Sequence, residues 1–178
     1  EDFMIALLKN GHSINSEDKS EIEEATAELI TQKSLVYKYS NDAARDLMIG
    51  GAAAFAVIPS GEAIYAMQEN EDLRYVVPSE GTELWSDLWC VPKASQSPEN
   101  AEKFIDFMLD SGNAYANFEY LTYAIPNTAI YTLIKDEYAD YADIVFSAKR
   151  ASKGSEILKN LDKETLKLYS AYWKRIKY

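Results

Sequence analysis

Cysteine and histidine are almost absent from this chain of 178 residues, which contains one of each. A single cysteine, Cys90, excludes an internal disulfide bond, and Cys90 and His12 together cannot supply a structural zinc site. Cys90 lies in an apolar stretch typical of a strand, so its thiol is expected to be buried. His12 follows Gly11 at the end of the first predicted helix, where a cation suits the helix dipole. We expect no metal site and no cofactor.

Positive charge is also scarce. The chain has 18 Lys and Arg residues against 29 Asp and Glu residues, a formal net charge of −11. Nucleic acid is therefore excluded as a partner, because contacts with phosphates require an excess of basic residues. An acidic surface favours cationic ligands and speeds their arrival. It also simply keeps a protein soluble, so charge alone leaves both interpretations open.

Long apolar runs are missing as well. The most apolar stretch, Gly50 to Pro59, has about ten residues, half of what a helix needs to span a bilayer. It is rich in alanine and is predicted to form a buried strand. The sequence begins directly in a helical pattern, with neither a start methionine nor a signal peptide. We therefore expect it to be cut from a longer precursor.

Helices are predicted where apolar residues recur every three or four positions between capping residues. They lie at 3–8, from a cap at Asn15 or Ser16 to residue 30, at 42–48, 63–67, 98–109 and 114–120, around 130 and 138, and from about 162 onwards. Strands are predicted at 35–39, 52–58, 74–77 and 84–91. Strands that alternate with helices indicate an α/β fold.

The segment Trp85-Ser86-Asp87-Leu88-Trp89 is the most informative for function. In a strand, Trp85, Asp87 and Trp89 would share one face, because side chains alternate. A carboxylate between two indoles needs a partner, and a bound ammonium group would provide one. Alternatively, Asp87 meets water or a lysine at a strand end while the tryptophans pack in the core. The pattern leaves both possibilities open.

Tyrosine is abundant, and six of the thirteen tyrosines crowd one third of the chain. Such a density suits the lining of an amphipathic site, but it also suits ordinary packing of half-buried helices. Tyr123 begins a predicted loop that ends at Asn127, a cap for the next helix. Loops often carry functional residues. The six tyrosines are Tyr115, Tyr120, Tyr123, Tyr131, Tyr138 and Tyr141.

Seven segments, in this order, resemble motifs of the polyamine-binding proteins of ABC importers. The first resembles the family's helix of the type E-x-F-x-x-A-L-x-x-x-G-Y-S, and later ones resemble P-x-E-G-x-x-x-W-x-D and G-Y-x-x-P-N. The likeness covers nearly the whole chain. The segments are Glu1–Ser13, Ala56–Ala63, Tyr75–Thr82, Leu84–Asp87, Asn100–Leu109, Tyr123–Asn127 and Leu168–Lys174.

The resemblance implies an α/β fold of the periplasmic-binding-protein-like type II. The fold would be incomplete, because only part of a two-lobed protein is present. Residues 1–84 would form part of the second lobe, and residues 85–146 a mainly helical return segment of the first lobe. Residues 147–178 would form a polar segment and a closing helix.

The family's function would be extracellular capture of putrescine or spermidine for an ABC transporter permease, without catalysis. Glu1 and Asp87 would hold the amino groups, and Trp85 and Tyr123 would line the methylene chain in a cleft between the lobes. The protein would lie in the periplasm or at the cell surface, with any membrane anchor in the part before Glu1. The incomplete chain is expected to dimerise through open edges.

Three departures from the family pattern keep other interpretations open. Pro59 stands where the family commonly has an aromatic residue that contacts the ligand. Residues 155–160 offer no clear polar contact, and the family's first half is absent before Glu1. The fold could therefore bind another small solute, or the chain could be a non-catalytic interaction domain. An enzyme would need an acid/base pair, for which only Glu1 and Asp87 can be nominated.

Overall fold

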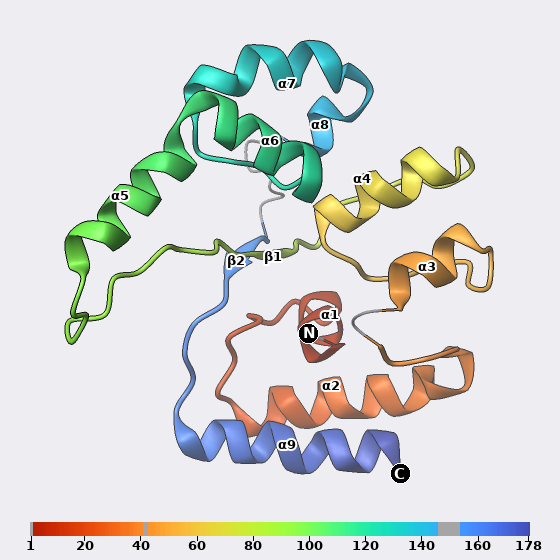
Figure 1. Cartoon of the computed structure of the whole chain (residues 1–178). Helices are drawn as coiled ribbons and strands as arrows, with labels where there is room; N and C mark the ends of the chain where they lie inside the picture. Colours follow the sequence, from red (N-terminus) through yellow and green to blue (C-terminus); the bar gives the residue numbers. More distant parts are fainter. Residues whose placement is uncertain (1, 41–42, 146–153) are drawn as a thin grey trace. The chain divides into compact units, whose positions relative to one another are not determined.

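The structure is a computed structural model that describes residues 2–40, 43–145 and 154–178 (Figure 1). The chain divides into two compact units, each built from segments far apart in sequence. These limits cut across the predicted 1–84, 85–146 and 147–178, and the assignment of segments to lobes stays a prediction. Unit 1 comprises Glu1–Tyr39, Val76–Trp85 and Ala151–Tyr178, and unit 2 comprises Ser40–Tyr75 and Ser86–Arg150.

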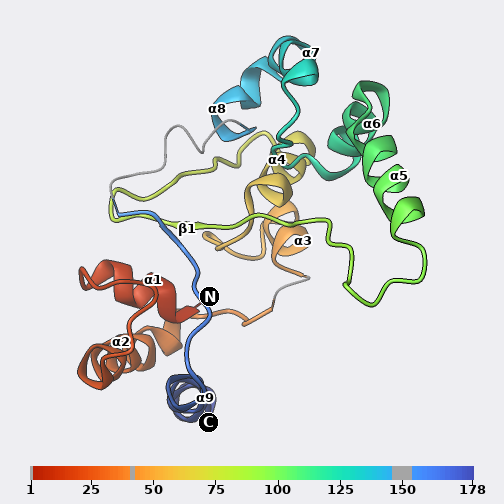
Figure 2. The same ribbon diagram turned by 90° about the vertical axis from the view of Figure 1, so that its left-hand side faces the viewer.

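Unit 1 is built on three helices, α1 (Asp2–Lys9), α2 (Lys19–Gln32) and α9 (Lys163–Lys177). A 3₁₀ turn, η1 (Lys33–Leu35), follows α2. Helix α9 packs along α2, and Figure 2 shows it nearly end-on. The apolar faces of the helices meet in one core, as their periodicity predicted. Its buried members are Phe3, Ala6, Leu7, Ile22, Ala25, Leu29, Tyr172 and Ile176.

Local signals set most helix ends in unit 1. Helix α1 stops before Gly11, which adopts the left-handed φ of 79° that glycine tolerates. Asp162, near which this helix was predicted to begin, caps α9 by accepting a hydrogen bond from the backbone N–H of Thr165 at 2.7 Å. The prediction for α2 was wrong. Asp18 caps this helix, rather than Asn15 or Ser16, and accepts from the N–H of Ser20 at 2.7 Å.

Strands are short in the described part of the chain. Strand β1 (Glu83–Leu84) pairs in parallel with β2 (Glu156–Ile157). Two glycines permit the close approach of the backbones beside this pair. Gly81 has a φ of 127°, and a Cβ on Gly154 would collide with the carbonyl oxygen of Glu80. The predicted strand at 84–91 is therefore strand only at its beginning.

The regular secondary structure in the described part of unit 2 is helical, and long segments without regular structure join its helices. It contains α3 (Ala44–Ile49), α4 (Ser60–Glu69), α5 (Pro98–Leu109), α6 (Ser111–Leu121), α7 (Tyr131–Glu137) and α8 (Ala142–Val145), with 3₁₀ turns η2 (Thr128–Ile130) and η3 (Ala139–Tyr141). Phe118 lies in its core, in edge contact with Tyr138. The buried members are Ile64, Ala114, Phe118, Ile130, Ile134 and Val145.

Three predicted strands, at 35–39, 52–58 and 74–77, are not strands in the described residues. The segment 52–58 was expected to be buried, yet Phe55 is 93% and Val57 is 70% exposed. Cys90, also expected to be buried, is exposed. A strand needs a neighbouring backbone to satisfy its N–H and C=O groups. Beside these segments the described chain supplies no such neighbour, so their apolar residues do not produce a sheet.

His12 links α1 to α2 through acidic partners and makes the stability of unit 1 dependent on pH. Its Nε2 lies 2.8 Å from Glu24 Oε2, and its Nδ1 lies 3.4 Å from Glu21 Oε1. The hydrogen bond with Glu24 raises the pKa of His12; desolvation opposes the rise, and the charges of Glu21, Glu24 and Asp18 add to it. A raised pKa in the folded state stabilises the fold below the unfolded value, and this stabilisation is lost as pH rises through the folded value.

Replacing His12 by Gln is therefore expected to lower the free energy of unfolding more at about pH 5.5 than at about pH 8.5. Urea unfolding of both proteins at the two pH values measures the difference. Lys9→Gln is the control, because it breaks the ion pair between Lys9 and Glu28 in the same unit and leaves the partners of His12 unchanged. An equal His12→Gln effect at both pH values would contradict the assignment.

Candidate functional site

The four residues that the resemblance nominated do not all belong to one unit of the described chain. Glu1 lies outside the described residues. Trp85 belongs to unit 1, immediately after β1, and is half exposed. Asp87 and Tyr123 both belong to unit 2 and are the two candidates that it brings into electrostatic reach of each other. The candidate site is therefore built here from unit 2.

Tyr123 is positioned by a junction between α6 and α4. Thr122, at the end of α6, adopts a left-handed φ of 57°. Its buried hydroxyl donates a hydrogen bond to the carbonyl oxygen of Gly61 at 2.8 Å. This bond joins the C-terminus of one helix to the first turn of the other, and the chain then continues into Tyr123.

The ring of Tyr123 rests directly on Gly61. A Cβ at position 61 would lie 2.9 Å from the Tyr123 ring and 2.7 Å from the carbonyl oxygen of Leu121. Real Cβ atoms do not approach other atoms so closely, so a larger residue would displace the ring. Glycine at position 61 therefore allows Tyr123 to lie at the start of α4.

The charges of two carboxylates act on the hydroxyl of Tyr123. Burial raises the pKa of Tyr123 most, and the negative charges of Glu62 and Asp87 raise it further. The backbone N–H of Glu62 acts in the opposite direction and lowers the pKa of Tyr123. Tyr123 thus lies at the N-terminus of α4, within the electrostatic field of both acidic side chains.

Only one of these two carboxylates, that of Glu62, forms an ion pair in the described part of unit 2. Glu62 Oε2 accepts a hydrogen bond from Arg45 Nη1 at 3.1 Å. Asp87 is exposed, and no lysine or arginine in the described part of unit 2 forms an ion pair with it. Asp87 therefore brings an uncompensated negative charge to the neighbourhood of Tyr123. Such a group can accept hydrogen bonds from an ammonium group.

The predicted alternation of Trp85, Asp87 and Trp89 lacks the strand on which it depended, because β1 ends at Leu84. Trp89 instead makes an edge contact with Phe104 of α5, with ring centroids 5.3 Å apart. Asp87 thus belongs to unit 2, but it does not lie in a strand. Trp85 and Trp89 therefore do not share one face of a strand with Asp87.

Sequence reasoning missed Glu62, Thr122 and the steric role of Gly61. An acidic residue in the first turn of a helix is common, because it suits the helix dipole, so Glu62 gave no distinctive signal. Thr122 closes a contact across 61 positions of sequence, which no local pattern reveals. Only the Gly in the motif Pro59-Ser60-Gly61 could have indicated a close approach.

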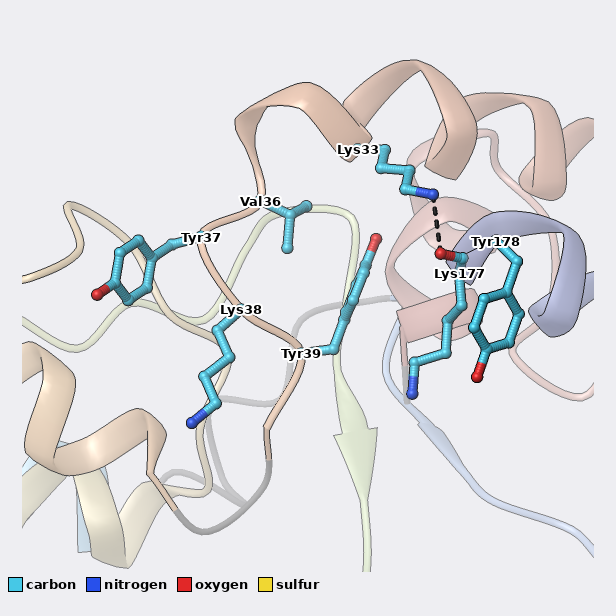
Figure 3. A pocket seen from close by; sticks show the side chains of 7 residues that line it. All are labelled: Lys33, Val36, Tyr37, Lys38, Tyr39, Lys177 and Tyr178. Atoms are coloured by element: carbon cyan, nitrogen blue, oxygen red, sulfur yellow. Dashed lines mark hydrogen bonds between the residues drawn. The ribbon is translucent and has the colours of Figure 1, made fainter.

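Unit 1 contains a separate hollow of about 250 Å³ (Figure 3). Lys33 Nζ donates a hydrogen bond to the carbonyl oxygen of Lys177 at 2.9 Å at its edge. Three lysines and no carboxylate line the hollow, so it is electrostatically unsuited to an amine. Its lining residues are Lys33, Val36, Tyr37, Lys38, Tyr39, Lys177 and Tyr178.

Over the ranges that the structure describes, no group of three or more His, Cys, Asp or Glu side chains is arranged to hold a metal ion. Within the same ranges, no helix combines the length and the apolar character required to cross a bilayer.

An exposed carboxylate without an ion pair in the described part of unit 2 is able to bind a small cation. Residues 2–145 match the family described as bacterial extracellular solute-binding protein, and the chain belongs to this family. Membership puts the chain on the outer side of the cytoplasmic membrane, in the periplasm or at the cell surface, as the resemblance predicted.

The similar proteins carry more specific names. The spermidine/putrescine-binding periplasmic protein of Salmonella typhimurium is 30% identical over 175 residues, which cover 98% of this chain and 50% of that protein. The spermidine/putrescine-binding periplasmic protein 1 of Haemophilus influenzae is 33% identical over 123 residues, which cover 69% of this chain and 33% of that protein. The putrescine/cadaverine-binding protein of Pseudomonas aeruginosa is 27% identical over 181 residues, covering 98% of this chain and 51% of that protein.

Solved structures agree with the sequence relatives. A putative spermidine/putrescine ABC transporter protein of Listeria monocytogenes superposes with a TM-score of 0.82 at 33% identity, covering 99% of this chain and 54% of that one. The substrate-binding protein PotD of Streptococcus pneumoniae gives 0.83 at 32% identity, covering 99% and 55%. The predicted fold class, an incomplete periplasmic-binding-protein fold, is confirmed. The chain spans about half the length of the curated relatives it matches.

Proposed function

We propose that the full-length protein, meaning a polypeptide of its relatives' length that contains this chain, captures putrescine or spermidine outside the cell. It delivers the amine to an ABC transporter permease and catalyses no reaction. Asp87 and Glu1 accept hydrogen bonds from the ammonium groups, and Trp85 and Tyr123 contact the methylenes. The relatives of Salmonella and Haemophilus are named for the same ligands.

One observation supports the proposal above the others. Asp87 brings negative charge to Tyr123, and no cation in the described part of unit 2 pairs with it. A structural ion pair would include its own lysine or arginine, whereas a capture site for a cation must keep a carboxylate available. Tyr123 adds an apolar ring beside this charge, which suits a ligand that alternates ammonium groups with methylenes.

Methylene burial and one charge pair are together sufficient for micromolar affinity towards putrescine. Burial of each methylene contributes about 0.8 kcal/mol, so the four carbons of putrescine contribute about 3 kcal/mol. A charge pair 4 Å apart contributes about 4 kcal/mol at an effective dielectric constant of 20, before desolvation. Together these terms make micromolar binding, about −8 kcal/mol, attainable.

Calorimetric titration of the full-length protein tests the proposal. Putrescine and spermidine are expected to bind with dissociation constants in the micromolar range or below. The neutral control, 1,4-butanediol, has the same four-carbon chain without charge and is expected not to bind. Equal binding of the diol and the diamine would contradict a charge-based site, and heat from continuous turnover of an amine would contradict a pure binding role.

A further inference from the structure

Glu62 and Arg45 form an ion pair beside the site that the proposed function does not use. Glu62 lies in the first turn of α4, next to Gly61, on which the ring of Tyr123 rests. Its carboxylate acts on Tyr123 together with Asp87. Both acidic side chains are therefore candidates for contact with an ammonium group that approaches Tyr123.

The guanidinium group of Arg45 interacts with three side chains. Its Nη1 lies 3.1 Å from Glu62 Oε2, and its Nε lies 3.0 Å from Asp46 Oδ1. Its guanidinium carbon lies 4.7 Å from the centroid of the Tyr65 ring, so the cation also interacts with a π-face. The side chains of Arg45 and Glu62 are only 34% and 38% exposed. The partly buried pair is screened less by solvent than an ordinary surface pair.

The local charge depends on this arginine. Asp87 and Glu62 each bring one negative charge to the surroundings of Tyr123, and Arg45 returns one positive charge through Glu62. One uncompensated negative charge remains. Without Arg45 there would be two, on side chains that both lie within electrostatic reach of one phenol. Two such carboxylates suit a ligand with two ammonium groups close together, as at the three-carbon end of spermidine.

We propose that Arg45 determines specificity by neutralising Glu62, so that unit 2 accepts one terminal ammonium group rather than a closely spaced pair. This inference rests on the proposed function. Arg45 favours putrescine, whose second ammonium group is farther away along the chain. Removal of Arg45 frees Glu62 to bind the secondary ammonium group of spermidine.

Arg45→Met tests the proposal, because methionine keeps an apolar body over Tyr65 and removes the charge. In calorimetric titrations of the full-length protein, the affinity for spermidine relative to putrescine is expected to rise about tenfold. Adding Glu62→Gln to this variant is expected to return the ratio to its original value. Arg74→Met is the matched control: Arg74 is an exposed arginine of the same unit that contacts the carbonyl oxygens of Glu71 and Leu73.

A ligand-free measurement separates this inference from the proposed function. With ¹³C-labelled tyrosine, NMR titration is expected to show a higher pKa for Tyr123 in Arg45→Met and an unchanged pKa in Arg74→Met. If this shift occurs but the ratio of affinities does not change, the specificity role is wrong and the proposed function stands. If the unmutated protein binds neither amine, both fail.

Glu62→Gln alone keeps the test decisive should Arg45→Met fail to fold. It removes one negative charge from the surroundings of Tyr123 and leaves Arg45 paired with Asp46, so both amines are expected to bind about tenfold more weakly. Unchanged binding of both amines would show that the ion pair has no influence on the site and would overturn the proposal.

Discussion

Replacing Asp87 by Asn is expected to weaken the binding of putrescine by the full-length protein at least about tenfold. The substitution conserves size and removes the charge. In the described part of unit 2, no lysine or arginine pairs with Asp87, so the mutation does not release a protein cation. Its main effect would be on the ligand, whose ammonium group would lose its counter-charge.

The expected magnitude follows from the cost of an unpaired charge. Truncation of one partner in a buried, hydrogen-bonded charge pair costs about 2–5 kcal/mol, much of it because the other charge stays buried and unpaired. A tenfold change in affinity corresponds to about 1.4 kcal/mol, so the tenfold prediction is the lower limit. Calorimetry measures the change directly.

A matched control separates this effect from the general loss of acidic charge. Asp72→Asn removes the same charge from an exposed turn of unit 2, where the backbone N–H of Asp72 bonds to Asn70. This variant is expected to bind putrescine within about twofold of the original protein, because exposed charges at a distance are screened by salt. Unchanged affinity in Asp87→Asn would refute the role of Asp87.

The 178-residue chain by itself is expected to bind putrescine at least about a hundredfold more weakly than the full-length protein and to self-associate. The weak binding follows because the chain spans about half the length of its relatives, so the proposed cleft would lack one side. Exposed apolar side chains in extended segments of unit 2 provide the reason for self-association. Phe55, Val57, Leu88 and Trp89 are 93%, 70%, 80% and 62% exposed.

Analytical ultracentrifugation over a range of protein concentrations measures the association. The double variant Phe55→Asp, Leu88→Asp is expected to shift the chain towards monomer, because charges on open edges oppose pairing with another chain. Tyr120→Asp is the matched control, since Tyr120 is equally exposed but lies on helix α6. A compact monomer that binds putrescine tightly would contradict both parts of this prediction.

The helices were predictable because their signals are local. Gly11 ends α1, Asp162 caps α9, and Asn127 caps η2 by accepting a hydrogen bond from the N–H of Ala129 at 3.1 Å. Each signal acts within a few residues, so a sequence read by itself contains all the necessary partners. The misplaced cap of α2 was an error of two or three positions among similar polar residues.

The strands were not predictable in the same way. The segments 52–58, 74–77 and 84–91 show apolar stretches suited to sheets, but only Glu83–Leu84 pairs with another described strand, at Glu156–Ile157. Strand formation depends on a partner backbone that the pattern of one segment does not identify. The exposure of Phe55 and Cys90 has the same cause.

The sequence by itself determined the helices, the acidic character of the chain and its resemblance to polyamine-binding proteins. It also nominated Asp87 and Tyr123, because composition, caps and motifs are properties of neighbouring residues. Only the tertiary structure decided that Tyr123 rests on Gly61, that Thr122 joins α6 to α4, and that Arg45 neutralises Glu62 but not Asp87. These contacts join residues 17 to 62 positions apart, and their energies depend on distances that folding alone establishes.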